Sequence, residues 1–195
     1  LQTDEIVALR SHYGFTKSQL GSVEAMTALV EQALVQQVSR CISIDVPGYF
    51  DTHGTLEQGP DQMKAYNAIA RLIDNLEEKE YPDGSGDSWL DRTTIMCCSE
   101  VCRTPIVNKE MGRDHWLTNC CVLAGGGIKG NQVIGQSSDV GLTPRPLDLA
   151  TGVFDAAGTY VTPDHIVRAL YTMIGYSKDV ADLRVEPLTA MLKGF

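Results

Sequence analysis

Apolar side chains recur at steps of three and four in three stretches of the chain, and this period predicts amphipathic helices. The first stretch is 22–39, the second opens at Pro60 and carries its apolar stripe from Met63 to Leu76, and the third is 164–174. A short amphipathic helix is expected near the end, over about 187–192. Pro60 fits the first turn of its helix, where a missing N–H costs nothing.

Short apolar, β-branched segments lie between these helices and predict buried strands at about 41–46, 93–98 and 119–124. Strands that alternate with helices indicate an α/β fold with a mostly parallel sheet flanked by helices. A length of 195 residues suits a single domain over 1–195. The polar segment 99–117 is too long for a plain connection and is therefore a functional candidate.

The composition and charge of the chain exclude some classes of function. Lys and Arg number 16 against 25 Asp and Glu, so a formal charge of −9 argues against broad nucleic-acid binding. No stretch approaches the roughly 20 apolar residues of a membrane span. The chain begins Leu-Gln-Thr-Asp without Met or a signal pattern, which suggests a processed or truncated polypeptide. Six cysteines are expected to be mainly core thiols, although export would permit disulfides.

Three of the four histidines lie within two positions of an aspartate: Asp51 with His53, Asp114 with His115, and Asp164 with His165. Imidazole nitrogens and carboxylate oxygens suit Zn²⁺, and also Mn²⁺ or Fe. Unrelated surface neighbours are the alternative, because Asp is common in this acidic chain. Asp164 also suits the first turn of the third helix.

The glycines and the basic residues give two weaker indications of a binding site. Gly125-x-Gly127-x-x-Gly130 follows a predicted strand, but residues 131–135 do not open the helix that a dinucleotide fingerprint requires. A glycine turn or a close backbone approach is the better interpretation. Basic residues around the long loop could attract an anion, or could simply be solvated charges. They are Arg103, Lys109, Arg113 and Lys129.

Four segments of the chain resemble motifs of one family. Val46–Gly54 (VPGYFDTHG) resembles the G-W-D-T-H segment and Ser99–Pro105 (SEVCRTP) the S-E-F-G-R-T-P segment of the DUF1501 family. Gly112–Trp116 (GRDHW) matches G-R-D-H-W, and Leu123–Gly135 (LAGGGIKGNQVIG) is close to L-A-G-G-G-I-K-G-G-Q-V-I-G. The motifs occur in the family's order and cover roughly residues 40–175.

The resemblance implies an alkaline phosphatase-like fold and a place in the alkaline phosphatase and sulfatase superfamily, whose DUF1501 members are mostly exported bacterial proteins. It implies metal ligands at Asp51, His53, Asp114 and His115, with His165 as a late ligand. Arg103, Arg113 and Lys129 are the anion-binding candidates. The cofactor implied is a divalent transition metal, zinc before manganese or iron.

Two departures from the family pattern limit this expectation. Val101-Cys102 stands where the family has Phe-Gly. The superfamily's first strand, with an early Asp and a Ser, Thr or modified Cys nucleophile, has no counterpart, so an N-terminal segment or a partner chain is expected to complete the site. The expected function is a periplasmic or secreted metal-dependent hydrolase of anionic phosphate or sulfate esters. A non-catalytic metal-binding or structural protein of the same fold is the alternative.

Overall fold

A computed structural model describes residues 3–195 and divides the chain into two compact units. The first unit comprises residues up to 92 together with Arg103–His115. The second comprises Thr93–Cys102 and Trp116–Phe195. Within the described residues, no helix is both long and apolar enough to cross a membrane.

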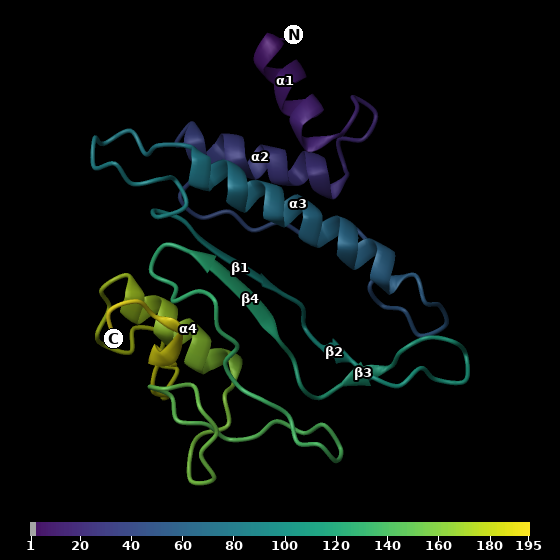
Figure 1. Cartoon of the computed structure of the whole chain (residues 1–195), viewed down its shortest axis with the longest axis vertical. Helices are drawn as coiled ribbons and strands as arrows, with labels where there is room; N and C mark the ends of the chain where they lie inside the picture. The colour runs from purple at the N-terminus through teal and green to yellow at the C-terminus, as the bar shows by residue number, and fades with distance from the viewer. Residues whose placement is uncertain (1–2) are drawn as a thin grey trace. The chain divides into compact units, whose positions relative to one another are not determined.

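The first unit is helical and contains α1 (Asp4–Tyr13), α2 (Val23–Val35) and α3 (Gln58–Glu78). Side-chain caps begin the first two helices: Thr3 accepts from the Ile6 N–H, and Ser22 accepts from the Ala25 N–H. Helices α2 and α3 lie side by side (Figure 1). The periodic stretches predicted from the sequence therefore form helices, with α2 ending earlier than expected.

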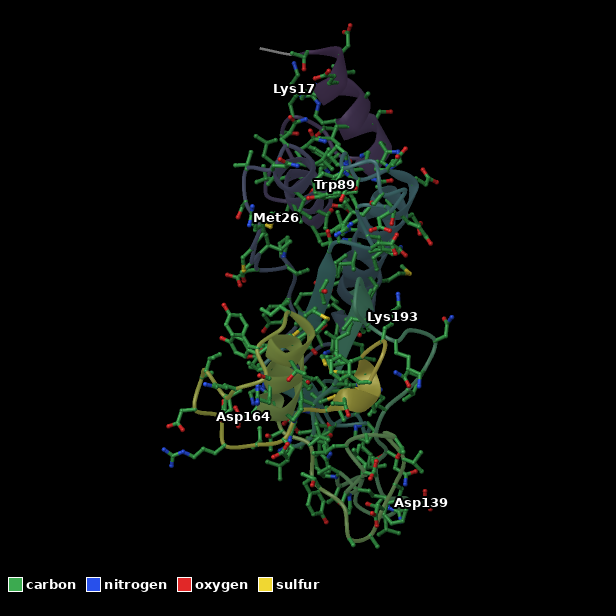
Figure 2. All side chains as sticks on the ribbon, turned by 90° about the vertical axis from the view of Figure 1, so that its left-hand side faces the viewer. Lys17, Met26, Trp89, Asp139, Asp164 and Lys193 are labelled. Carbon is green, nitrogen blue, oxygen red and sulfur yellow. The ribbon has the colours of Figure 1, made fainter. Side chains whose placement is uncertain are left out.

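A buried polar group lies inside this helical unit. Glu31 of α2 is only 1% exposed and accepts hydrogen bonds from the Tyr13 hydroxyl at 2.5 Å and the Asn75 amide at 2.8 Å. Lys79 also pairs with its carboxylate. The indole of Trp89, labelled in Figure 2, is 7% exposed and packs edge-on against Tyr81. Apolar packing and a satisfied ionic network together hold this unit.

The second unit contains β1 (Thr94–Cys98), β4 (Cys121–Gly125), α4 (Pro163–Met173) and a 3₁₀ turn over Thr189–Met191. Strands β1 and β4 pair antiparallel, from Thr94 opposite Gly125 to Cys98 opposite Cys121. The core of the unit gathers residues from β4, α4 and the C-terminal turn. Its buried members are Ile128, Leu147, Ala169, Leu188, Ala190, Met191 and Leu192.

The expected α/β fold, an alkaline phosphatase-like and mostly parallel sheet flanked by helices, is wrong. Over residues 3–195 the strands form two small antiparallel sheets, β1 with β4 and β2 (Cys102–Arg103) with β3 (His115–Trp116). Residues 99–120, which join β1 to β4 and are all described, contain the short β2–β3 pair and no helix, whereas the connection between two parallel strands is usually a helix. Residues 41–46, predicted as a strand, are described without strand pairing and alternate between exposed and half-buried.

Two smaller expectations concern the second unit. The prediction of core thiols is wrong, because each of the six cysteines is exposed or only half-buried, as a two-stranded ribbon buries neither face fully. The close backbone approach at the glycine run is confirmed. A Cβ at Gly127 would lie 2.3 Å from the Met173 sulfur, and residues 126–162, all of them described, contain no helix.

Candidate metal centre

Two loops of the first unit bring the predicted ligands together. Asp51 and His53 lie in the segment before α3, and His115 lies at the end of the loop that begins at Arg103. The Nε2 atoms of the two histidines are 3.2 Å apart. Asp51 Oδ1 lies 3.0 Å from His53 Nε2 and 3.1 Å from His115 Nε2. Ligands of tetrahedral Zn²⁺ are roughly 3.3 Å apart, so this triangle has the size of one face of such a site.

The donor set also fits a metal chemically. Two imidazole nitrogens and one carboxylate oxygen suit Zn²⁺, Mn²⁺ and Fe²⁺. Three protein ligands leave further positions open, as in catalytic rather than structural zinc sites. All three side chains are about half exposed or more, so water and a substrate can reach them.

Asp114 contacts the His53 ring on the side that faces away from the triangle of Asp51, His53 and His115. Its Oδ1 lies 2.8 Å from His53 Nδ1, the ring nitrogen that does not face the triangle. A carboxylate on the distal nitrogen of a ligating histidine fixes the tautomer and the ring orientation. The hydrogen bonds from His53 and then from Asn108 hold the pKa of the Asp114 carboxyl below its ordinary value. The structure therefore places Asp114 against His53 Nδ1 and outside the triangle, whereas the resemblance implied a metal ligand.

Asn108 and Gly112, neither of them singled out in the sequence, hold the two loops together. The Asn108 amide donates to the His53 carbonyl at 3.0 Å and to Asp114 Oδ1 at 3.1 Å. Its Oδ1 accepts from the Gly112 N–H at 2.9 Å. Gly112 is buried directly against the His53 backbone, where a Cβ would lie 2.1 Å from the carbonyl carbon. The glycine of the G-R-D-H-W segment is the available sequence signal, because glycine permits such an approach.

Arg103 supplies the positive charge beside the triangle. Its NH2 lies 2.6 Å from Asp51 Oδ1, and its NH1 donates to the Arg113 carbonyl at 3.2 Å. The hydrogen bond from Arg103, followed by that from His115, lowers the pKa of Asp51 to about 2. Asp51 is therefore ionised, as a metal ligand must be, across the whole neutral and mildly acidic range.

Comparison with known proteins places these segments in a family. A family described as "Protein of unknown function (DUF1501)" matches residues 3–159. The chain belongs to the DUF1501 family. Neither the curated proteins nor the solved structures that were compared contain a match to it.

The remaining predicted residues of this DUF1501 chain have other surroundings. The Arg113 guanidinium donates to the Thr104 and Pro105 carbonyls. His165 is 5% exposed on α4 of the second unit, where its Nδ1 lies 2.8 Å from the Glu186 carbonyl. Lys129 is exposed in the same unit, and its backbone N–H donates to Met191. The roles of these three residues stay predictions.

Two threonines of the DUF1501 motifs lie near the triangle: Thr52 stands between Asp51 and His53 in the chain, and Thr104 contacts the backbone of Asp114. The Thr52 side chain is completely buried, and its Oγ1 is the buried side-chain polar atom in the described residues that has no hydrogen-bond partner. Thr104 donates its hydroxyl to the Ile106 carbonyl and accepts from the Asp114 N–H. The Thr52 hydroxyl is therefore shielded from solvent, and the Thr104 hydroxyl is engaged by backbone groups.

Proposed function

We propose that this DUF1501 chain carries the metal-binding part of an exported, divalent-metal-dependent hydrolase of phosphate or sulfate esters. The single observation that supports it most is the triangle of Asp51, His53 and His115, whose ligand atoms lie within 4.8 Å of one another. Zinc is the first choice of metal, with manganese and iron as the other candidates. The substrate class comes from the resemblance of the motifs to the alkaline phosphatase and sulfatase superfamily.

Each residue of the cluster has a distinct role in this proposal. Asp51, His53 and His115 hold the metal, and Asp114 orients His53 through Nδ1. A bound divalent metal supplies Lewis acidity toward an ester oxygen. Arg103 lies within 3.4 Å of His53 Nε2, so its guanidinium is positioned to bind an anionic oxygen that approaches the metal. Asp51 Oδ1 would then bind the metal in place of its contact with Arg103 NH2.

A non-catalytic metal-binding protein is the second candidate, and the two threonines favour it. Thr52 is buried and Thr104 is fully hydrogen-bonded, so neither provides the nucleophile that ester hydrolysis in this superfamily uses. The two candidates share the metal site and differ in turnover. An anionic ester is the partner in the first candidate.

Metal content tests the metal site, which both candidate functions share. Chain purified without chelator and dialysed against zinc should hold about one metal per molecule, measured by elemental analysis. His115→Ala removes one of three ligands and should lower the affinity at least tenfold. His12→Ala is the matched control, because His12 belongs to α1 and contacts Asn75. Equal metal content in the parent and His115→Ala would refute the site.

Turnover separates the two candidates. The chain is assayed on aryl phosphates and aryl sulfates with zinc or manganese, beside Asp114→Asn. Metal-dependent hydrolysis that Asp114→Asn reduces supports the hydrolase. For the isolated 195-residue chain we expect very low turnover, because the nucleophile is expected from a completing segment or partner chain. Stoichiometric metal without hydrolysis, even when such a segment or partner is supplied, supports the binding protein.

A further inference from the structure

Five of the six cysteines lie on two neighbouring segments of the second unit. Cys97 and Cys98 end β1, Cys102 begins β2, and Cys120 and Cys121 lie at the start of β4. Cys41 belongs to the first unit. The proposed metal centre uses none of these thiols, so the inference from them does not rest on the proposed function.

The register of the β1–β4 pair sets Cys98 directly opposite Cys121. Directly opposed residues of an antiparallel pair share one face, with Cα atoms about 4.5–5.5 Å apart. A disulfide spans Cα separations of about 4.4–6.8 Å, so this pair can be bridged with little backbone movement. Cys97 points to the other face, where its opposite residue is Val122.

A second pair of cysteines, Cys102 and Cys120, lies further along the same two segments. The Cys102 N–H donates to the Thr118 carbonyl at 3.3 Å, so the two segments still run together there. Cys120 lies two positions beyond Thr118, so Cys102 and Cys120 belong to the same stretch of the ribbon. Burial, followed by the neighbouring Cys102, raises the pKa of the Cys120 thiol. The two thiols are therefore neighbours on adjoining segments of the ribbon.

We infer that this chain forms two disulfides across the ribbon, Cys98 with Cys121 and Cys102 with Cys120. Together they would staple the two segments on either side of the loop that carries Asp114 and His115. Cys97 stays a thiol because its directly opposite residue is Val122, and Cys41 stays a thiol because it belongs to the first unit and not to this ribbon.

The oxidant is a small-molecule or protein disulfide. The thiolate of the exposed Cys98 attacks one sulfur of that disulfide, forms a mixed disulfide and releases one thiolate. The Cys121 thiolate then attacks the Cys98 sulfur, which forms the internal S–S bond and releases the second thiolate. Two cysteine thiols are oxidised and one external disulfide is reduced to two thiols, with the two protons taken up by those products. Because burial raises the pKa of Cys121, the exchange should be faster above neutral pH.

Thiol counting tests the number of bridges. The full chain is incubated with oxidised glutathione at mildly alkaline pH, denatured with chelator present, and titrated before and after reduction. The expected count is two thiols before reduction and six afterwards. The midpoint of thermal unfolding should fall by on the order of 10 °C on reduction, because the loop that the two disulfides close regains its conformational freedom in the unfolded chain. A gain other than four thiols would overturn the inference.

Variants and peptide mapping test the pairing. Trypsin cleaves after Arg92, Arg103, Arg113 and Lys129, so residues 93–103 and 114–129 should stay joined until reduction. Cys98→Ser should lower the gain from four thiols to two. Cys97→Ser is the matched control, with the same chemistry on the opposite face, and should keep the gain at four. The pairing is wrong if Cys97→Ser lowers the gain, or if glutathione remains attached in place of the internal bridges.

Discussion

Gly112 offers the sharpest test of how the candidate metal centre is built. It lies in the loop of Arg113, Asp114 and His115, and its backbone packs against the backbone of His53. In Gly112→Ala the added Cβ would lie 2.1 Å from both the carbonyl carbon and the oxygen of His53, and 2.5 Å from the Gly54 nitrogen. These neighbours are backbone atoms, so no side-chain rotation can relieve the contact.

The size of the effect follows from these distances. Non-bonded carbon atoms prefer separations of about 3.5–4.0 Å, so the two loops must separate by about 1 Å or more. Metal–ligand distances tolerate only about 0.2 Å, and the two loops carry different ligands. We therefore expect zinc affinity to fall by about tenfold to a hundredfold, with a loss of about 1–3 kcal/mol in the free energy of unfolding from overpacking.

Zinc titration by calorimetry and urea unfolding of the apo chain measure the two quantities separately. Gly54→Ala is the matched control: it follows His53 directly, and a Cβ there meets nothing within 4 Å. It should keep the parent affinity and stability. If Gly112→Ala binds zinc like the parent, then the loops are not held in contact as described, and the triangle is not preorganised by Gly112.

Three further predictions concern buried polar groups and pH. Glu31→Gln removes the ionised acceptor of Tyr13 and should destabilise the chain by about 2–4 kcal/mol in urea unfolding, whereas exposed Glu77→Gln should change little. Burial raises the pKa of Glu31, but its hydrogen bonds together hold this pKa below the ordinary value of 4.5. The loss of stability in Glu31→Gln should therefore be complete above pH 4.5 and become smaller as the pH falls below it. Thr52→Val removes a buried hydroxyl without a partner and should stabilise by about 1 kcal/mol; destabilisation would mean that the hydroxyl has a partner in solution. Zinc should be lost in the mildly acidic range as protons compete for the imidazoles, and Asp51, with its pKa at about 2, should not contribute; zinc content that stays constant down to pH 4 would contradict imidazole ligation.

The sequence by itself determined most of the local elements and the residue types of the candidate site, although it gave no signal for α1 and predicted a strand at 41–46 that does not form. Helical periodicity predicted α2, α3 and α4, and the short apolar segments before and after the long loop became β1 and β4. Asp-x-His and Asp-His pairs predicted a metal cluster, and Asp51, His53 and His115 do come together. These features are local, because side-chain period and ligand type are written in consecutive residues.

Strand pairing and the arrangement of the ligands were decided only by the tertiary structure. Whether 94–98 and 121–125 pair parallel or antiparallel depends on how the chain returns between them, and the apolar pattern of a strand does not encode this. Asp114 and Asp51 look equivalent as carboxylates beside histidines, yet one meets the distal nitrogen of His53 and the other faces the triangle. That difference arises because Gly112 and Asn108 set one loop against the backbone of another more than 50 positions away, a long-range contact that no local pattern specifies.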